Sequence, residues 1–146
     1  MQGPEATGMP VVTVTTSEPE GLRVLWNGGT GGGEMEWKAW IAGDPDELSA
    51  VWRAAAAGPA PVVNFERYVV IAQAGQGGTC HAKILALEAE ASGRLSLRYD
   101  PPGGIMPCTL AATRVARIIA VPRRVLTATV VFLDGFAFQV PEVPFE

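Results

Sequence analysis

The stretch Asp44–Ala57, which reads DPDELSAVWRAAAA, decides the fold class because no other stretch shows a clear helical pattern. Asp44 is a suitable N-cap, and Glu47 stands three residues later, at the spacing of a capping box. The apolar side chains recur at the spacing of one helix face: Leu48, Val51, Trp52 and Ala55. Gly58-Pro59 then stops the helix. The stretch therefore predicts one principal helix at about 44–57 that buries a single apolar stripe.

Working outward from this helix, both flanks read as strands. Apolar runs with strand character occur at Val11–Thr16, Leu22–Trp26, Glu36–Ala42, Tyr68–Ala74, Cys80–Glu90, Arg94–Asp100, Ala112–Val121, Val125–Leu133 and Phe136–Val140. Val11–Thr16 is short and β-branched, as expected for an edge strand, whereas Tyr68–Ala74 is almost wholly apolar, as expected for a central strand. Asp134-Gly135 is a typical two-residue hairpin turn.

This order of elements predicts an α+β, mostly β, fold: a single domain with a mainly antiparallel sheet and one helix. The 146 residues suit one domain, and 17 glycines with 12 prolines suit strands joined by turns. We expect a flexible tail at 1–10, the domain at 11–140 and a tail at 141–146. Loops are expected at Asn27–Gly33 and, as a turn, at Gly75–Thr79. The expected core comprises Trp37, Ile41, Leu48, Val51, Trp52, Val69, Ile71, Leu85, Leu95, Leu97 and Val130.

Composition excludes several classes of partner. The net charge is −4 and the sequence pI is 5.0, which disfavours a general binder of nucleic acid or of anionic membranes. No apolar run approaches the ~18 residues that a transmembrane helix needs. The first eight residues lack the basic and apolar segments of a signal peptide. Localisation stays open between the cytoplasm and, if a leader has been removed, the cell envelope.

The residue types of common active sites are present without their usual spacing. Gly75–Thr79 is followed by a strand rather than a helix and lacks a Lys-Ser or Lys-Thr pair, which disfavours a phosphate loop. Cys80 and His81 are adjacent, and neighbouring residues of a regular strand point to opposite faces, so they cannot form a dyad there. Cys80, His81 and Cys108 also lack the spacing of a zinc site. We expect no catalytic residue, metal or cofactor; the alternative is a small-ligand-binding domain or a thiol enzyme that uses Cys80 and His81.

Two further groups allow a structural and a functional interpretation. Arg114, Arg117, Arg123 and Arg124 form a basic cluster in sequence, either a local patch for a partner or solvated positions at a strand end. We favour the solvated strand end, above all for Arg123 and Arg124. Cys80 and Cys108 either form a disulfide, worth roughly 3.5 kcal/mol for a loop of this length, or pack as two separate thiols.

Short motifs follow one another in a fixed order between residues 22 and 124. The glycine-rich loop and the helix are followed by Val63-Asn64-Phe65, the apolar strand from Tyr68 to Ala72, the stretch from Gly75 to Ile84, and Val121-Pro122-Arg123. In this order and spacing, the chain resembles the C-terminal domain family of the protease complex subunit PrcB. Asn64 replaces the family's usual acid, and Cys80 and His81 stand where glycine and tyrosine are usual.

The resemblance implies a non-catalytic function. The family comprises small β-rich bacterial domains, mostly exported or lipid-anchored, with no established catalytic residues to carry over. It implies a non-catalytic protein-interaction or assembly module whose partner is another envelope protein or a protease subunit. Because loops on a rigid sheet commonly carry recognition, the candidate binding residues are Asn64, Glu66, Arg67, Gln76, Thr79 and His81.

Overall fold

The computed structural model describes residues 11–30, 36–56, 58–77, 82–100 and 113–144. The elements in chain order are β2 (Val11–Thr15), β3 (Arg23–Gly29), β4 (Lys38–Ala42), α1 (Pro45–Ala55), β5 (Tyr68–Gly77), β6 (Lys83–Glu90), β7 (Arg94–Asp100), β8 (Thr113–Pro122), the 3-10 turn η2 (Arg123–Val125), β9 (Val130–Leu133) and β10 (Phe136–Gln139). The predicted α+β, mostly β, architecture with one principal helix is confirmed.

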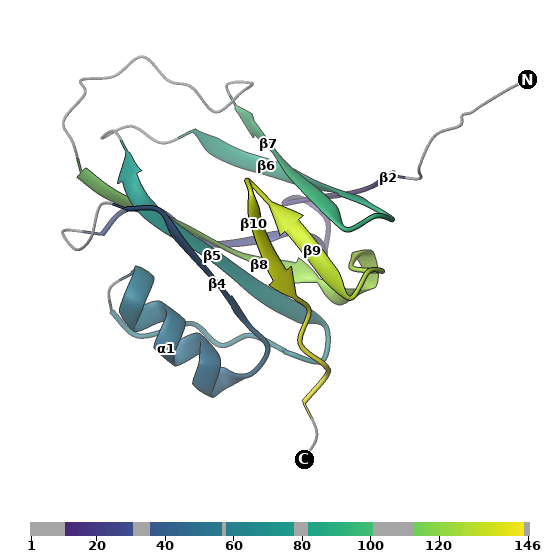
Figure 1. Cartoon of the computed structure of the whole chain (residues 1–146), viewed down its shortest axis with the longest axis horizontal. Helices are drawn as coiled ribbons and strands as arrows, with labels where there is room; N and C mark the ends of the chain where they lie inside the picture. The colour runs from purple at the N-terminus through teal and green to yellow at the C-terminus, as the bar shows by residue number, and fades with distance from the viewer. Residues whose placement is uncertain (1–10, 31–35, 57, 78–81, 101–112, 145–146) are drawn as a thin grey trace, which may run out of the picture.

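The described strands form two sheets. One has the order β10-β9-β7-β6-β2 and the other β3-β8-β5-β4. All their pairings are antiparallel except that of β7 with β9. In Figure 1, α1 lies on one side of the four-stranded sheet, and β6 and β7 lie on the other. The chain therefore has three layers, and β2 takes the edge position expected for the first strand.

The four-stranded sheet is the middle layer, which explains why its central strands are apolar on both faces. Val70 and Ala72 of β5 pack in the cluster that includes the apolar stripe of α1. Ile71, between them, faces the five-stranded sheet in a second cluster with Leu87 and Leu133. A strand buried on both faces shows a continuous apolar run instead of alternation. The interpretation of Tyr68–Ala74 as a central strand is confirmed.

The helix begins as its sequence predicts. The Asp44 side chain accepts a hydrogen bond from the Glu47 backbone N–H at 2.8 Å, and the Glu47 carboxylate accepts one from the Gly43 N–H at 2.7 Å. The first contact is the N-cap bond of a capping box; in the second, the Glu47 carboxylate reaches Gly43, one residue before the N-cap, instead of the N-cap N–H itself. The helix ends at Ala55, before the expected end at 57.

The loops expected at Asn27–Gly33 and Gly75–Thr79 are wrong in their first residues, because the neighbouring strands continue through them; residues 31–33 and 78–79 lie outside the described residues. Asn27–Gly29 belong to β3, and Gly75–Gly77 belong to β5. At Gly75, an added Cβ would lie 2.4 Å from the Trp37 ring, so this glycine lets the indole lie directly on the backbone. The strand expected at Val125–Leu133 is confirmed only over Val130–Leu133, which is β9; Val125 belongs to η2.

Most of the residues predicted to be in the core are buried or half-buried, and three are exposed, one of them where strand pairing is irregular. Buried as expected are Leu48, Val51, Trp52, Val69, Ile71 and Leu95, whereas Ile41 and Leu97 are half-buried. Leu85 is 38% exposed, because the register of β6 against β7 shifts between Ile84 and Ala86. Val130 is 39% exposed, since β9 turns Val131 inward, and Trp37 is 37% exposed.

A second register shift separates side chains expected on one face of β3. The pairing of β3 with β8 shifts between Val24 and Trp26. Leu22 consequently packs between the two sheets, whereas Trp26 packs edge-on against Trp52, with ring centroids 6.0 Å apart. Leu22 and Trp26 therefore pack in different layers, although simple alternation along Leu22–Trp26 would place them on one face.

The expected hairpin and the alternating strand are confirmed. Asp134 and Gly135 have φ values of 52° and 85°, the left-handed conformation that a tight hairpin turn requires, and they join β9 to β10. β7 spans Arg94–Asp100 as predicted. Within the described ranges, no helix is long and apolar enough to span a membrane.

Candidate functional site

The sequence-predicted binding residues do not form one site in the described structure. Asn64, Glu66 and Arg67 lie just before β5, whereas Gln76 lies near the opposite end of this strand. At about 3.3 Å per residue, Arg67 and Gln76 are separated by roughly 30 Å along the strand. Asn64 has a local role, since its side-chain oxygen accepts the Glu66 N–H at 3.0 Å. Thr79 and His81 lie outside the described residues.

The two cysteines lie outside the part of the chain that the structure describes. The disulfide between Cys80 and Cys108 and the alternative of two separate thiols therefore both stay predictions. Among the described residues, no group of three or more His, Cys, Asp or Glu side chains is placed to hold a metal ion.

Three of the four clustered arginines hold the fold together. Arg123 donates from Nε to the Phe65 carbonyl at 2.7 Å and from Nη1 to the Pro141 carbonyl at 2.6 Å, which ties the C-terminal stretch to the body. Burial lowers the pKa of Arg123. Arg124 donates to the Glu20 carbonyl at 2.7 Å. The expectation of a solvated strand end is therefore wrong for Arg123.

Arg114 has a similar structural role on β8. Its side chain is buried and donates from Nη2 to the Ala54 carbonyl at 2.8 Å, at the C-terminus of α1. A cation at this end of a helix also interacts favourably with the helix dipole. Arg114 therefore connects the helix to the sheet.

The fourth arginine, Arg117, is the centre of a polar cluster between the two sheets. Gln73 and Arg117 are cross-strand partners on β5 and β8, and both stand on the face toward the five-stranded sheet. Tyr99 comes from β7 and Asp134 from the β9–β10 turn. Arg117 Nη1 donates to the Tyr99 hydroxyl at 2.6 Å, and its Nη2 lies 3.9 Å from Asp134 Oδ2. Gln73 Nε2 donates to the same carboxylate oxygen at 3.2 Å.

Aromatic rings flank the Arg117 guanidinium. Its Cζ lies 5.3 Å from the centroid of the Trp37 ring and 5.8 Å from that of Tyr99, both within the range of a cation–π contact. Arg117 Nε is buried and has no hydrogen-bond partner within the described ranges. Burial, with a contribution from the nearby Asp134 carboxylate, raises the pKa of Tyr99 although Arg117 opposes the shift. The phenol is therefore protonated at neutral pH.

The polar cluster lies beside an open edge of β7. β7 pairs with β6 along almost its whole length, but with β9 only at Arg94 and Leu95. Beyond these two residues, the Asp134-Gly135 turn directs the chain away, and no strand in the described ranges pairs with this side of β7. A groove of about 450 Å³ follows this edge. Its lining residues are Arg94, Leu95, Ser96, Leu97, Tyr99, Phe132, Asp134 and Gly135.

The backbone groups at this edge can be assigned from the neighbouring hydrogen bonds. The Phe132 N–H donates to the Gly93 carbonyl at 2.9 Å, so Gly93 presents its carbonyl to the β9 side. Backbone groups of alternate residues in a strand point to the same side. Leu97 and Tyr99 therefore direct their N–H and C=O groups into the groove.

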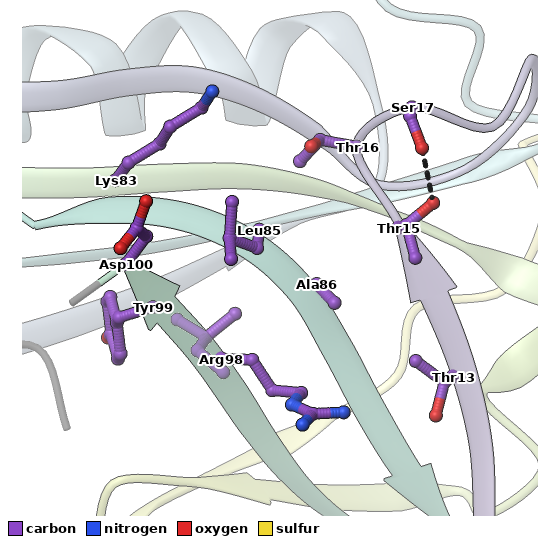
Figure 2. Close-up of a pocket in the computed structure, with 11 residues that line it drawn as sticks. Thr13, Thr15, Thr16, Ser17, Lys83, Leu85, Ala86, Arg98, Tyr99 and Asp100 are labelled. Carbon is purple, nitrogen blue, oxygen red and sulfur yellow. Dashed lines mark hydrogen bonds between the residues drawn. The ribbon is translucent and has the colours of Figure 1, made fainter. Parts of the chain in front are cut away.

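A broader hollow of about 870 Å³ lies where β2, β6 and β7 meet. Figure 2 shows hydroxyl side chains on the β2 side of this hollow, with Lys83, Arg98 and Asp100 from the other two strands. Three of its polar side chains already have partners: Thr15 and Ser17 share a hydrogen bond of 3.1 Å, and Arg98 pairs with Glu88 at 3.2 Å. The β7 groove is the stronger candidate because it combines open backbone groups with the Arg117 cluster.

The sequence contains one signal that points to this cluster. Gln73 interrupts the apolar run of β5 and is 2% exposed, and Arg117 interrupts the apolar run of β8. Buried polar groups need hydrogen-bond partners, so two such interruptions in strands buried on both faces indicate a polar network. Tyr99 and Asp134 carry no comparable signal, because both are ordinary residues for a strand and a turn.

Comparisons of the chain with protein families, curated proteins and solved structures found no match.

Proposed function

We propose that this chain is a non-catalytic protein-interaction module that binds an extended segment of its partner along β7. The observation that carries the proposal is that, among the described residues, no strand pairs with one side of β7 beyond Leu95, beside a groove of about 450 Å³. An exposed strand edge is a template on which another chain can pair. Recognition by strand addition uses main-chain hydrogen bonds for affinity and adjacent pockets for specificity.

The groove has both components of such recognition. Leu97 and Tyr99 offer two N–H and two C=O groups, and each main-chain hydrogen bond contributes a net ~0.5–1.5 kcal/mol. Ordering a peptide costs about 1–2 kcal/mol per residue in backbone entropy, so these bonds alone are insufficient. Phe132, which is 47% exposed at the groove, supplies apolar surface for a side chain of the bound segment.

The resemblance to the PrcB C-terminal domain family supports the same class of function and suggests the setting. In this proposal the partner is another envelope protein or a subunit of a cell-envelope protease complex, and the chain contributes assembly rather than catalysis. A bacterial, extracytoplasmic location is part of this proposal. The β-rich scaffold suits the role, because it holds the open edge rigidly between β6 and the β9–β10 turn.

Blocking the edge without changing the body of the sheet tests the proposal. Proline at Leu97 removes an N–H that points into the groove and is not needed for pairing with β6. Thr13→Pro is the matched control: the Thr15 N–H donates to Glu18 rather than to β6, so the alternate N–H of Thr13 also faces outward, on the far edge of the sheet.

The measurement compares retention of envelope proteins by the immobilised wild type and by both variants at micromolar concentration. Each variant must first give the same far-UV circular dichroism spectrum as the wild type, which shows that it folds. We expect Leu97→Pro to reduce retention of the same proteins at least tenfold and Thr13→Pro to leave it within twofold. Equal retention by Leu97→Pro and the wild type, or no retention by the wild type, would contradict the proposal.

A further inference from the structure

We infer that the β7 groove leads to a subsite for a carboxylate, formed by Tyr99 of the groove lining and by Arg117 beside it, which binds an acidic group of the partner segment. This inference rests on the proposed strand addition and names the chemistry of the segment that fits it. Tyr99 belongs both to the groove lining and to the Arg117 cluster, so the two features are continuous.

The cluster has more hydrogen-bond donors than acceptors. Arg117 Nε has no partner in the described ranges, and Arg117 Nη1 uses the Tyr99 oxygen as its acceptor. The Tyr99 hydroxyl therefore directs its own hydrogen elsewhere, and no described residue receives it. Asp134 is the acidic group of the cluster, yet its Oδ2 already accepts from Gln73 and lies 3.9 Å from Arg117 Nη2. Arg117 Nε is itself buried, so an added acceptor would complete the network at Nη2, which is too far from Asp134 for a hydrogen bond, and at the Tyr99 hydroxyl hydrogen.

A singly charged carboxylate fits this arrangement better than a phosphate. Arg117 Nη2 and the Tyr99 hydroxyl offer two neighbouring donors, which match the two oxygens of a carboxylate. Trp37 and Tyr99 flank the guanidinium, and this partial exclusion of water strengthens its attraction for an anion. The Asp134 carboxylate lies 3.9 Å from Arg117 Nη2, so it would repel a doubly charged phosphate more strongly than a singly charged carboxylate.

The strand geometry specifies where the acidic group must stand. Tyr99 faces the four-stranded sheet, whereas Ser96 and Arg98 occupy alternate positions on the other face of β7. A segment paired with β7 also alternates its side chains. The carboxylate must therefore stand at an inward-facing position level with Tyr99, or at the C-terminus of a segment that ends there.

The subsite is tested first with acetate as the probe. NMR follows the side-chain Nε–Hε signals of the arginines during titration at constant ionic strength. We expect the Arg117 signal to shift saturably, and Tyr99→Phe, which removes only the hydroxyl, to weaken acetate binding at least threefold. Arg98→Lys is the control and should leave the Arg117 titration unchanged. A linear shift shared by Arg117, Arg94 and Arg98, or no shift of Arg117, would overturn the subsite.

The second test uses a displayed library of random eight-residue peptides. We expect peptides selected by the wild type to share Asp or Glu at one position, to bind Arg117→Lys at least tenfold more weakly and to bind Arg98→Lys within twofold. Synthesis of the selected peptides with free and amidated C-termini distinguishes a side-chain carboxylate from a terminal one.

The outcomes separate this inference from the proposed function. Selected peptides that lose binding to Leu97→Pro, but share no acidic group and bind Arg117→Lys normally, overturn the carboxylate subsite and leave strand addition standing. A selection without any binder sensitive to Leu97→Pro overturns strand addition, and the subsite as part of it.

Discussion

Replacing Arg114 with methionine should destabilise the chain by removing the connection between β8 and the end of α1. Methionine retains most of the apolar stem and lacks the guanidinium. The lost contacts are the 2.8 Å bond to the Ala54 carbonyl, a longer 3.5 Å contact with the Ala55 carbonyl and a 3.1 Å bond to Thr30 Oγ1. A hydrogen bond to a charged group contributes ~1.5–3 kcal/mol, and a partly buried cation at a helix C-terminus contributes up to ~2 kcal/mol. Because the 3.5 Å contact adds little, we expect a loss of about 2–4 kcal/mol in the free energy of unfolding.

Urea unfolding followed by far-UV circular dichroism measures this loss. Arg53→Met is the matched control, since Arg53 lies in the last turn of the same helix and is exposed. It shares the favourable position near the helix dipole, but surface substitutions of this kind usually change stability by no more than ~0.5 kcal/mol. If the two variants differ by less than about 0.5 kcal/mol, Arg114 does not fix the helix in the way its hydrogen bonds indicate.

Three other outcomes are expected. Trp52→Ala should cost about 3–5 kcal/mol, because the side chain is 5% exposed and packs against Trp26; a urea-derived loss below ~1 kcal/mol would contradict this packing. Because the pKa of Tyr99 is raised, the native state keeps a phenol proton that the unfolded chain releases near pH 10. The stability that Tyr99 contributes is therefore present below that pH and is lost as pH rises through the raised pKa. The urea midpoint of the wild type should fall more steeply above about pH 10 than that of Tyr99→Phe. Thiol titration under denaturing, non-reducing conditions distinguishes the alternatives for Cys80 and Cys108: two free thiols exclude the disulfide, and none in a monomer supports it.

The parts of the fold that the sequence predicts well are those encoded by local pattern. The start of α1 depends on Asp44 and Glu47, which interact with backbone groups only a few residues away. The β9–β10 turn depends on the tolerance of Asp134-Gly135 for positive φ. β7 alternates without irregularity. In each case, the residues that cause the structure are neighbours in the chain, so their spacing is sufficient evidence.

The site was predicted less well, because its residues gain their roles from partners far away in the sequence. Asn64 and Gln76 looked like parts of one recognition surface, yet an uninterrupted β5 separates them. Arg114, Arg117 and Arg123 looked alike as basic residues near strand ends. Tertiary packing gave them three different roles: binding a helix end, joining two sheets and holding the C-terminal stretch.

The sequence by itself determined the class of fold, the position of the helix and the identity of the most buried strand, since periodicity and capping are local properties. Tertiary structure alone decided which side chains face which layer after the shifts between Val24 and Trp26 and between Ile84 and Ala86, since a bulge depends on the partner strand. It also decided that, among the described strands, none pairs with β7 beyond Leu95 on the side of β9. Strand pairing is a relation between segments distant in the chain, and β9 ends at Leu133, where the Asp134-Gly135 turn leads into β10.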